Sequence, residues 1–415
     1  MRSVNSLDAV LAPRLAEQRA RVRYRQRHTT GGVGPRVRRD GRDWLNVCSN
    51  DYLGLAGDPR LAEALAVGAR RFGVGGGASH LVCGHSEAHE ALERRLAAWT
   101  GCERALLFSS GYQANLGVIS ALLGRGDIAL HDRLNHASLL DGTRLAGARL
   151  ERFTHGDAAA CETRLAALGS GRRRLVISDG VFSMDGDCAD LNALVTHCER
   201  HDAWLMVDDA HGLGVLGEHG AGTREAQGLA PGRVPILVGT LGKALGTHGA
   251  FVAGSETLIE ALIQFARPYV YTTSLSPALA WATLTSLDIV RDEPERRAHL
   301  QALIARFRQH SADLAEVGLS PLPSATPIQP LQIMQHGEGA NEATALALAQ
   351  ALEARGIWCS AIRPPTVPVG SARLRITLSA AHELADIDRL GEALHDAARQ
   401  VIGQGGAVVA PRAPA

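Results

Sequence analysis

Lysine, the residue type best suited to imine chemistry, occurs a single time in this chain. Of the 43 Lys and Arg residues, Lys243 is the sole lysine, so arginine carries every other side-chain positive charge of this kind. A guanidinium group keeps its proton to a pKa above about 12, whereas a primary amine can lose its proton and add to a carbonyl group. The sequence therefore marks Lys243 as a candidate nucleophile or base, against the simpler interpretation of a leftover surface lysine.

Short apolar runs, each followed by a polar or glycine-containing turn, predict the elements that would position this lysine. Helical patterns such as 114–123 and 190–200 follow several of these runs. This alternation is typical of an α/β domain around a mostly parallel sheet, whose ligands bind beyond the carboxyl ends of the strands. The predicted strands cover residues 105–108, 128–130, 175–177, 204–207 and 236–238.

Reactive side chains follow each of these runs. Taken singly, Ser110 is a plain helix cap and His136 a surface histidine. Their meeting at one sheet edge with the other groups favours a shared site instead. The residues in question are Ser110-Gly111-Tyr112 after the first run, His136 after the second, Asp179 and Ser183 after the third, Asp208 and His211 after the fourth, and Thr240 and Lys243 after the fifth.

Three other patterns would indicate different chemistry. Gly212-Leu-Gly-Val-Leu-Gly217 has dinucleotide-binding spacing, but loop-like residues rather than a helical pattern follow it. Ser183 lacks the G-x-S-x-G turn of a serine hydrolase. His85 and His89 could share a helix face, yet no third metal ligand has recognisable spacing, so no metal site is predicted.

The composition is that of an ordinary folded protein. Among 415 residues, 46% are hydrophobic, and 43 acidic residues balance 43 basic ones, which argues against a polyanion binder. The sequence contains neither a membrane-length apolar run nor a secretory signal, and its seven cysteines form no C-x-x-C pair, so we expect a cytoplasmic protein with reduced thiols.

Changes in pattern along the chain suggest four parts. Residues 1–45 would form an N-terminal helix, over 7–27, and an arm. Residues 46–283 would form the large domain with the predicted sheet, and 284–403 a smaller α+β domain. The tail, 404–415, has no periodicity and is expected to be disordered.

Five motifs around the candidate residues together resemble the α-oxoamine synthases, which are fold type I enzymes dependent on pyridoxal phosphate (PLP). The likeness runs from about residue 5 to 400. It implies a large domain with a mostly parallel sheet, a smaller α+β C-terminal domain, and a homodimer with sites at the subunit interface. The motifs are Ser-Asn50-Asp-Tyr-Leu-Gly-Leu, Asp-Arg-x-x-His136-Ala-Ser, Gly-Val-Phe-Ser183-Met-Asp-Gly-Asp, Asp208-Asp-Ala-His211-Gly and Thr240-x-Gly-Lys243.

This resemblance implies a role for each matched residue. Lys243 would hold PLP covalently and act as the base, Asp208 would pair with its ring nitrogen, and His136 would stack on the ring. The chain departs from the family at Asp179, where members carry Glu, so the side chain there reaches one methylene less. The remaining cofactor contacts would come from Gly111, Tyr112, Ser183, His211 and Thr240, with Thr273 of the partner subunit.

Two C-terminal segments are most similar to the branch of the family that serves biotin biosynthesis. They are Ala361-Ile-Arg363-Pro-Pro-Thr366-Val-Pro and Ala-Arg373-Leu-Arg375-Ile-Thr-Leu. That branch joins L-alanine to a pimeloyl thioester of coenzyme A or an acyl carrier protein, whereas other branches use glycine or serine with acetyl, succinyl or palmitoyl thioesters. The likeness implies substrate contacts from Arg375, which would clamp the amino-acid carboxylate, from Asn50 and His136, and from Arg21, Arg363 and Thr366 in the acyl pocket.

Two other classes of function stay open at this point. Some relatives act as non-catalytic partner subunits, but the presence of Lys243 in its motif argues against that interpretation. A dinucleotide-dependent oxidoreductase would need a helix to begin on the glycines of 212–217.

Overall fold

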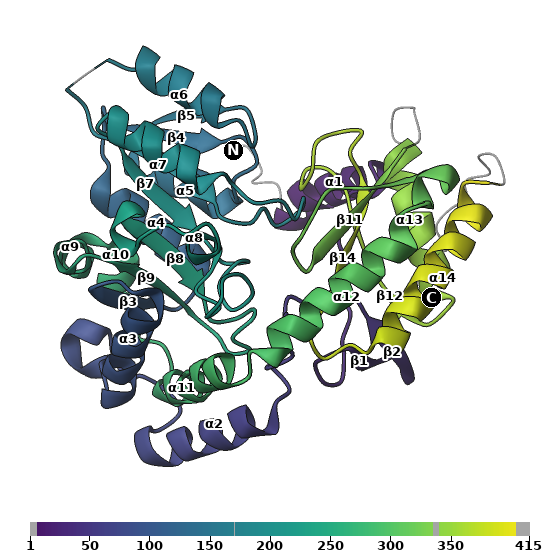
Figure 1. Cartoon of the computed structure of the whole chain (residues 1–415), viewed down its shortest axis with the longest axis horizontal. Coiled ribbons are helices and arrows are strands. Elements are labelled where there is room, and N and C mark those ends of the chain that lie inside the picture. Colours follow the sequence, from purple (N-terminus) through teal and green to yellow (C-terminus); the bar gives the residue numbers. More distant parts are fainter. Residues whose placement is uncertain (1–5, 170, 335–339, 404–415) are drawn as a thin grey trace.

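The computed structural model describes residues 6–169, 171–334 and 340–403, and Figure 1 shows two parts side by side. The larger part, in blue and teal, surrounds a wide sheet; the smaller, in green and yellow, contains the C-terminal helices. The predicted fold class, a large α/β domain with a smaller α+β domain, is confirmed. The tail 404–415, predicted to be disordered, lies outside the described residues.

A mostly parallel sheet forms the centre of the larger part. Its strands are β3 (Arg104–Phe108), β4 (Ile128–Asp132), β5 (Arg149–Phe153), β6 (Arg174–Asp179), β7 (Trp204–Asp208), β8 (Ile236–Thr240) and β9 (Ala250–Gly254). The order is β3-β9-β8-β7-β6-β4-β5, and β9 runs antiparallel to both of its neighbours. All five predicted strands are present. The edge strand β5 escaped prediction because Arg149, Glu151 and Arg152 interrupt its apolar pattern.

Helices cover both faces of this sheet. Val118 and Ile119 of α4 pack with residues of α9 on one face, and Leu165 of α6 packs with Leu194 of α7 on the other. Such two-sided cover explains why the central strands are continuously apolar. The helices of this part are α2 (Pro59–Phe72), α3 (Glu87–Thr100), α4 (Gly111–Leu122), α5 (Ala137–Ala146), α6 (Ala158–Ala167), α7 (Leu191–Arg200), α8 (Thr223–Ala226), α9 (Glu256–Phe265), α10 (Arg267–Val270) and α11 (Pro277–Asp292), with short π- and 3₁₀-helical turns at His80–Gly84 and Pro231–Arg233.

The smaller part contains an antiparallel sheet in the order β10-β11-β14-β13, and helices from the C-terminal half of the chain pack beside it. The boundary expected between residues 283 and 284 falls inside α11, which runs on to Asp292. The elements are α12 (Glu295–Ser311), a 3₁₀ turn (Leu314–Val317), β10 (Leu319–Pro321), β11 (Ile328–Ile333), α13 (Ala340–Glu353), β13 (Ser360–Ile362), β14 (Arg373–Thr377) and α14 (Leu384–Val401).

The N-terminal arm pairs with the C-terminal part of the chain. β1 (Arg36–Arg39) and β2 (Arg42–Asn46) form a hairpin to which β12 (Ile357–Trp358) adds in parallel. Helix α1 covers only Leu7–Ala20, so the helix predicted over 7–27 is wrong beyond residue 20. Because α1 buries none of its residues, no packing extends it into the arginine-rich stretch, and Val22 turns the chain with a φ of 57°.

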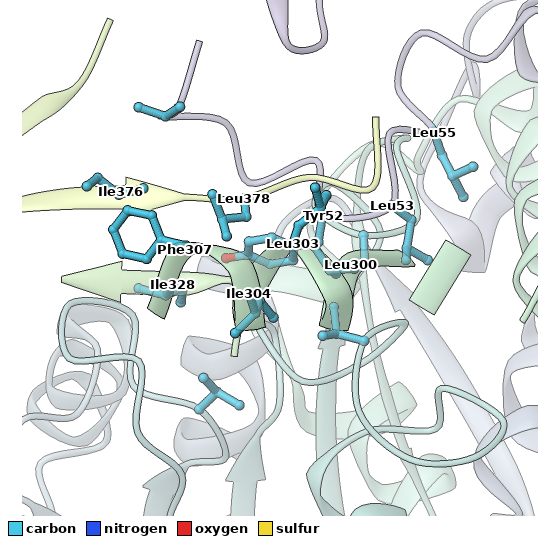
Figure 2. Close-up of a cluster of buried hydrophobic side chains, with 14 of the residues drawn as sticks. Tyr52, Leu53, Leu55, Leu300, Leu303, Ile304, Phe307, Ile328, Ile376 and Leu378 are labelled. Atoms are coloured by element: carbon cyan, nitrogen blue, oxygen red, sulfur yellow. The ribbon is translucent and has the colours of Figure 1, made fainter. Parts of the chain in front are cut away.

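One buried cluster ties the start of the large domain to the small one, as Figure 2 shows. Residues just after the arm insert between α12 and the small sheet. Burial of this apolar surface fixes the segment that carries Asn50 and Tyr52. The labelled members are Tyr52, Leu53 and Leu55 from that segment, Leu300, Leu303, Ile304 and Phe307 from α12, Ile328 and Ile376 from the small sheet, and Leu378 just after β14.

None of the helices in the described ranges is long and apolar enough to cross a membrane.

An ion cluster holds the loop after β6 against the sheet edge. His155 Nδ1 lies 2.9 Å from Asp132 Oδ1, and its Nε2 lies 3.0 Å from Asp187 Oδ2. Its ring also meets Phe182 edge-on, with centroids 4.4 Å apart. Burial alone would lower the pKa of His155, but the hydrogen bonds to the two carboxylates raise it to about 10.

We predict that His155→Gln destabilises the fold by about 2 kcal/mol at pH 6. Because the folded-state pKa is raised, the stabilisation is complete below about pH 6.5, the ordinary value, and is lost as the pH rises through about 10. Urea unfolding at pH 6 and pH 10 measures the free energy of unfolding of both proteins, and the difference between them should be smaller at pH 10. The exposed His219, paired with Glu225, provides the control His219→Gln, which should leave the stability close to that of wild type. A constant deficit in His155→Gln across this range would contradict the charge argument.

Candidate active site

The carboxyl ends of β3, β4, β6, β7 and β8 lie at one edge of the large sheet. Because β9 lies between β8 and β3 and is antiparallel to both, β3 runs parallel to the other four strands. Asp179 and Asp208 are paired neighbours at the ends of β6 and β7. The structure therefore brings the predicted strand-end residues together. Lys243 follows β8 at this edge.

Lys243 is half-buried, and its amine contacts His211. The Nζ atom lies 2.8 Å from His211 Nε2, and His211 Nδ1 lies 2.6 Å from the hydroxyl of Tyr52. Burial lowers the pKa of Lys243 to about 8, while Asp208 and Asp179 act to raise it and Arg375 acts to lower it. The amine is thus readily available in its neutral, nucleophilic form at mildly alkaline pH.

Asp208 is buried and held by N–H donors. Its Oδ2 accepts from Asn115 Nδ2 at 2.7 Å and its Oδ1 from the backbone of Ala210 at 3.1 Å. Asp179 is also buried, and its Oδ2 accepts from the backbone N–H of His136 at 2.9 Å. Burial, and then the nearby Asp208 carboxylate, raise the pKa of Asp179 well above its usual range. Although its side chain is one methylene shorter than Glu, Asp179 fixes the backbone of the turn that carries His136 through this hydrogen bond.

His136 and the start of α4 frame the other side. The His136 ring is exposed and caps α5, with Nδ1 2.7 Å from Ser138 Oγ, and Tyr112 meets it edge-on at 6.4 Å. Ser110 caps α4 through Gln113 N at 3.2 Å. The first N–H groups of a helix lack intrahelical acceptors, so the N–H groups of Gly111 and Tyr112 are suited to an anion.

Arg375, on β14, reaches this edge from the small domain. Its Nη1 and Nη2 each lie 3.1 Å from Asn50 Oδ1, and its Nε donates to the carbonyl of Ser183 at 2.6 Å. Thr377 Oγ1 accepts a further bond at 3.0 Å. Among the described residues no carboxylate pairs with Arg375, although it is buried. The guanidinium is therefore positioned for an incoming carboxylate.

The arginines expected in the acyl pocket lie in different surroundings. Arg21, at the end of α1, is exposed and pairs with Glu17 at 2.7 Å. Arg363 is half-buried and donates to the carbonyl of Val22, while its Nε is buried without a partner among the described residues. Arg25 Nη2 lies 3.4 Å from Thr366 Oγ1. Burial is the main cause that lowers the pKa of Arg363, and the positive charge of Arg25 lowers it further. The structure thus brings Arg25, which the sequence did not single out, to Arg363 and Thr366.

Two further candidates lie at the margins of this site. Thr240, at the end of β8, is half-buried, and its hydroxyl donates to the carbonyl of Gly249 at 3.1 Å. Thr273 is exposed, in the segment that precedes α11. A cavity of about 390 Å³ opens beside Lys243, with Asn50, Thr247 and Trp358 in its wall.

The histidines weighed as metal ligands form a cluster with His80, all three offering ring nitrogens within 4.8 Å. His80 Nδ1 and His85 Nδ1 hydrogen-bond to each other at 2.9 Å. His89 accepts from the backbone of Ser86 at 3.0 Å and reaches the carbonyl of Leu275 at 2.7 Å. These bonds occupy both His89 nitrogens, so the cluster is explained by its hydrogen bonding.

The side chains of this edge fit PLP. They provide a primary amine, a buried carboxylate for a ring nitrogen, an exposed imidazole for a ring face and a helix start for a phosphate. A Cβ at Gly111 would meet nothing within 4 Å, so the helix start has open space before it. Two of the residues that hold these groups, Tyr52 and Asn115, escaped sequence analysis. Asn115 lies one helical turn after Gly111 on the predicted helix, and that spacing could have indicated it.

Comparison with known proteins agrees with this geometry. Residues 42–394 match the family model described as aminotransferase class I and II. The chain is 57% identical to 8-amino-7-oxononanoate synthase of Cellvibrio japonicus (strain Ueda107), covering 94% of this chain and 97% of that protein. It is 58% identical to the enzyme of the same name from Pseudomonas putida (strain W619), covering 93% and 96%.

Solved structures show the same fold. Serine palmitoyltransferase from S. paucimobilis, with a bound PLP–myriocin aldimine, has a TM-score of 0.88 at 29% identity and covers 96% of this chain and 99% of its own. The 8-amino-7-oxononanoate synthase from Francisella tularensis has a TM-score of 0.73 at 30% identity, covering 87% and 98%. The expected PLP-dependent transferase fold is thereby confirmed.

We predict that acetic anhydride acylates Lys243 of the folded, ligand-free chain with a rate that rises through about pH 8. Asp208→Asn should move this midpoint down by about one unit, because it removes a carboxylate that favours the ammonium form. Mass spectrometry of the peptide containing residue 243 separates it from the α-amino group. The urea-unfolded chain is the control, with a midpoint of about 10.4. A folded-state midpoint near that value, or an upward shift in Asp208→Asn, would refute the assigned balance of burial and charge.

Proposed function

The chain belongs to the class I and II aminotransferase family and, within it, to the 8-amino-7-oxononanoate synthases, and on this premise we propose that it condenses L-alanine with a pimeloyl thioester. The products are 8-amino-7-oxononanoate, CO₂ and the free thiol carrier, in biotin biosynthesis. The observation that carries the proposal is the placement of the sole lysine, 2.8 Å from His211 and within the influence of two buried carboxylates, at the strand ends of this fold.

PLP, when bound, supplies an electron sink for negative charge that develops at the alanine Cα. Lys243 would bind the cofactor through its amine and would afterwards take the Cα proton at Nζ. The Asp208 carboxylate, held by hydrogen bonds from Asn115 and Ala210, would accept a hydrogen bond from the protonated ring nitrogen of the cofactor. The exposed face of His136 supports the ring. These roles match a primary amine, an anion and a flat imidazole to the three features of the cofactor.

Phosphate and phenolic contacts come from the surrounding turns. The N–H groups of Gly111 and Tyr112 bind the phosphate at the start of α4, together with Thr240. Ser183 and His211 hydrogen-bond the phenolic oxygen. We also propose a homodimer in the cytoplasm, in which the exposed Thr273 of the partner subunit completes the phosphate site.

The substrate carboxylates call for different arginines. Arg375 clamps the alanine carboxylate as a bidentate donor, with Asn50 beside it. The far carboxylate of the pimeloyl chain needs a second cation, because a buried charge without a partner costs several kcal/mol. Arg363 and Thr366, with Arg21, are assigned to this pocket. The oxidoreductase alternative lacks support, since the helix that follows Gly212–Gly217, α8, begins only at Thr223.

We predict that Lys243→Arg abolishes turnover, because guanidinium forms no imine at neutral pH. Borohydride reduction of the wild-type holoenzyme should fix the cofactor on the single peptide that contains residue 243, as mass spectrometry would show. The same treatment of Lys243→Arg is the control and should label no peptide. Label on another peptide of the wild type would refute the lysine assignment.

We predict that Arg363→Ala lowers kcat/KM for pimeloyl-CoA by about 10²-fold, the effect of losing an arginine–carboxylate contact. Octanoyl-CoA, which lacks the far carboxylate, should change less than about threefold. Arg21 is paired with Glu17 in the structure. The variant Arg21→Ala, assayed with the same two donors, tests the assignment of Arg21 to the acyl pocket. Steady-state assays with alanine provide the measurement.

Equal losses for both donors would mean that Arg363 serves the fold or the coenzyme instead. In the wild type, assays of alanine, glycine and serine against pimeloyl, acetyl and succinyl thioesters test the reaction itself. Higher kcat/KM for any pair other than alanine and pimeloyl would refute the proposed substrates.

A further inference from the structure

The hydroxyl of Tyr52 joins the lysine to the carboxylate clamp. It lies 2.6 Å from His211 Nδ1 and 3.2 Å from Asn50 Oδ1. Beyond these, His211 Nε2 contacts Lys243 Nζ at 2.8 Å, and Arg375 donates to Asn50 Oδ1. The Tyr52 ring is completely buried in the cluster of Figure 2, so packing against the small domain fixes where the hydroxyl points.

A phenol has one hydrogen to donate, and the distances indicate which acceptor receives it. The 2.6 Å separation from His211 Nδ1 is typical of an O–H donor, whereas 3.2 Å from Asn50 Oδ1 is long for one. That amide oxygen already receives two N–H groups of Arg375 at 3.1 Å each. Burial raises the pKa of Tyr52 to about 12, so the phenol keeps its hydrogen.

We propose that Tyr52 is a positioning residue whose hydroxyl donates to His211 Nδ1 and thereby holds the imidazole in the tautomer with Nε2–H directed at the Lys243 amine. Burial and the positive charge of Lys243 lower the pKa of His211 well below its ordinary range, so the ring is neutral and carries one hydrogen. An Nε2–H group can donate to a neutral amine but opposes an ammonium group. This tautomer therefore favours neutral Lys243.

Other charged and titratable groups also face Lys243. Asp208 and Asp179 at the strand ends favour its ammonium form, and Arg375 from the small domain disfavours it. His136 is close enough to be affected by the lysine charge. Tyr52 has no charge of its own, so Tyr52→Phe leaves each of these groups in place. Tyr52→Phe would affect Lys243 only by changing which ring nitrogen of His211 carries the hydrogen.

The use of neutral Lys243 in catalysis rests on the proposed function, but the tautomer of His211 and the charge of Lys243 do not. Both can be measured in the full-length chain without cofactor or substrate. Failure of the pimeloyl assay would thus refute the proposed function and leave this inference standing. Failure of the tautomer and titration measurements would refute the role of Tyr52 and leave the proposed reaction standing.

The sole lysine makes the test direct, because [¹⁵N]lysine labelling gives one Nζ resonance. In the wild type this resonance should titrate near pH 8, and Tyr52→Phe should raise its midpoint by about one unit or more, as the freed imidazole turns an acceptor to the ammonium group. Tyr269→Phe is the matched control, since Tyr269 is buried and stacks on His80 elsewhere; it should leave the midpoint unchanged. An unchanged or lowered midpoint in Tyr52→Phe would overturn the proposal.

A second measurement needs no Tyr52 variant and covers the case in which Tyr52→Phe fails to fold. In wild-type chain labelled with [¹⁵N]histidine, the two ring resonances of His211 are identified by their loss in His211→Gln. Their shifts distinguish the tautomers. Hydrogen on Nε2 supports the proposal, and hydrogen on Nδ1 overturns it.

Discussion

The partial burial of one amine is the constraint around which the site is built. Moving the ammonium group of Lys243 out of water costs free energy, and this cost lowers its pKa to about 8. The nearby carboxylates of Asp208 and Asp179 offset part of the cost. A lysine without those carboxylates would lose its proton more readily, and one left in water would keep it far above neutral pH. The chemistry of the site depends on this balance between desolvation and attraction.

The same edge of the sheet must hold two carboxyl groups side by side. Asp179 and Asp208 are register neighbours on β6 and β7, and both are buried. Their mutual repulsion adds to the burial that raises the pKa of Asp179 well above its usual range. Asp208 instead receives two N–H donors, from the Asn115 side chain and the backbone of Ala210. Similar residues thus acquire different roles from their hydrogen-bond partners.

The small domain contributes more than cover for the cavity. Arg375 donates from β14 to the carbonyl of Ser183, and Arg373 pairs with Asp185 at 2.6 Å, so the small sheet holds the loop after β6. From the opposite side, His155 holds the same loop through Asp187. The apolar cluster around α12 fixes Tyr52 between the two domains. Relative movement of the domains would therefore disturb the lysine, the loop and the carboxylate clamp together.

Five strands of the large sheet and the chemistry at their ends could be predicted from sequence, because apolar runs of the right length and the polar residues that follow them are local patterns. The strands β5 and β9 were not predicted. The sole lysine and its motif were likewise readable without coordinates. Which side chains meet across long stretches of chain depends on the packing of the folded chain. Tyr52 reaches His211, and Arg25 rather than Arg21 reaches Thr366, through packing that no spacing encodes. Helix α1 ended early for the same reason: local periodicity predicted its continuation, but no burial stabilises it.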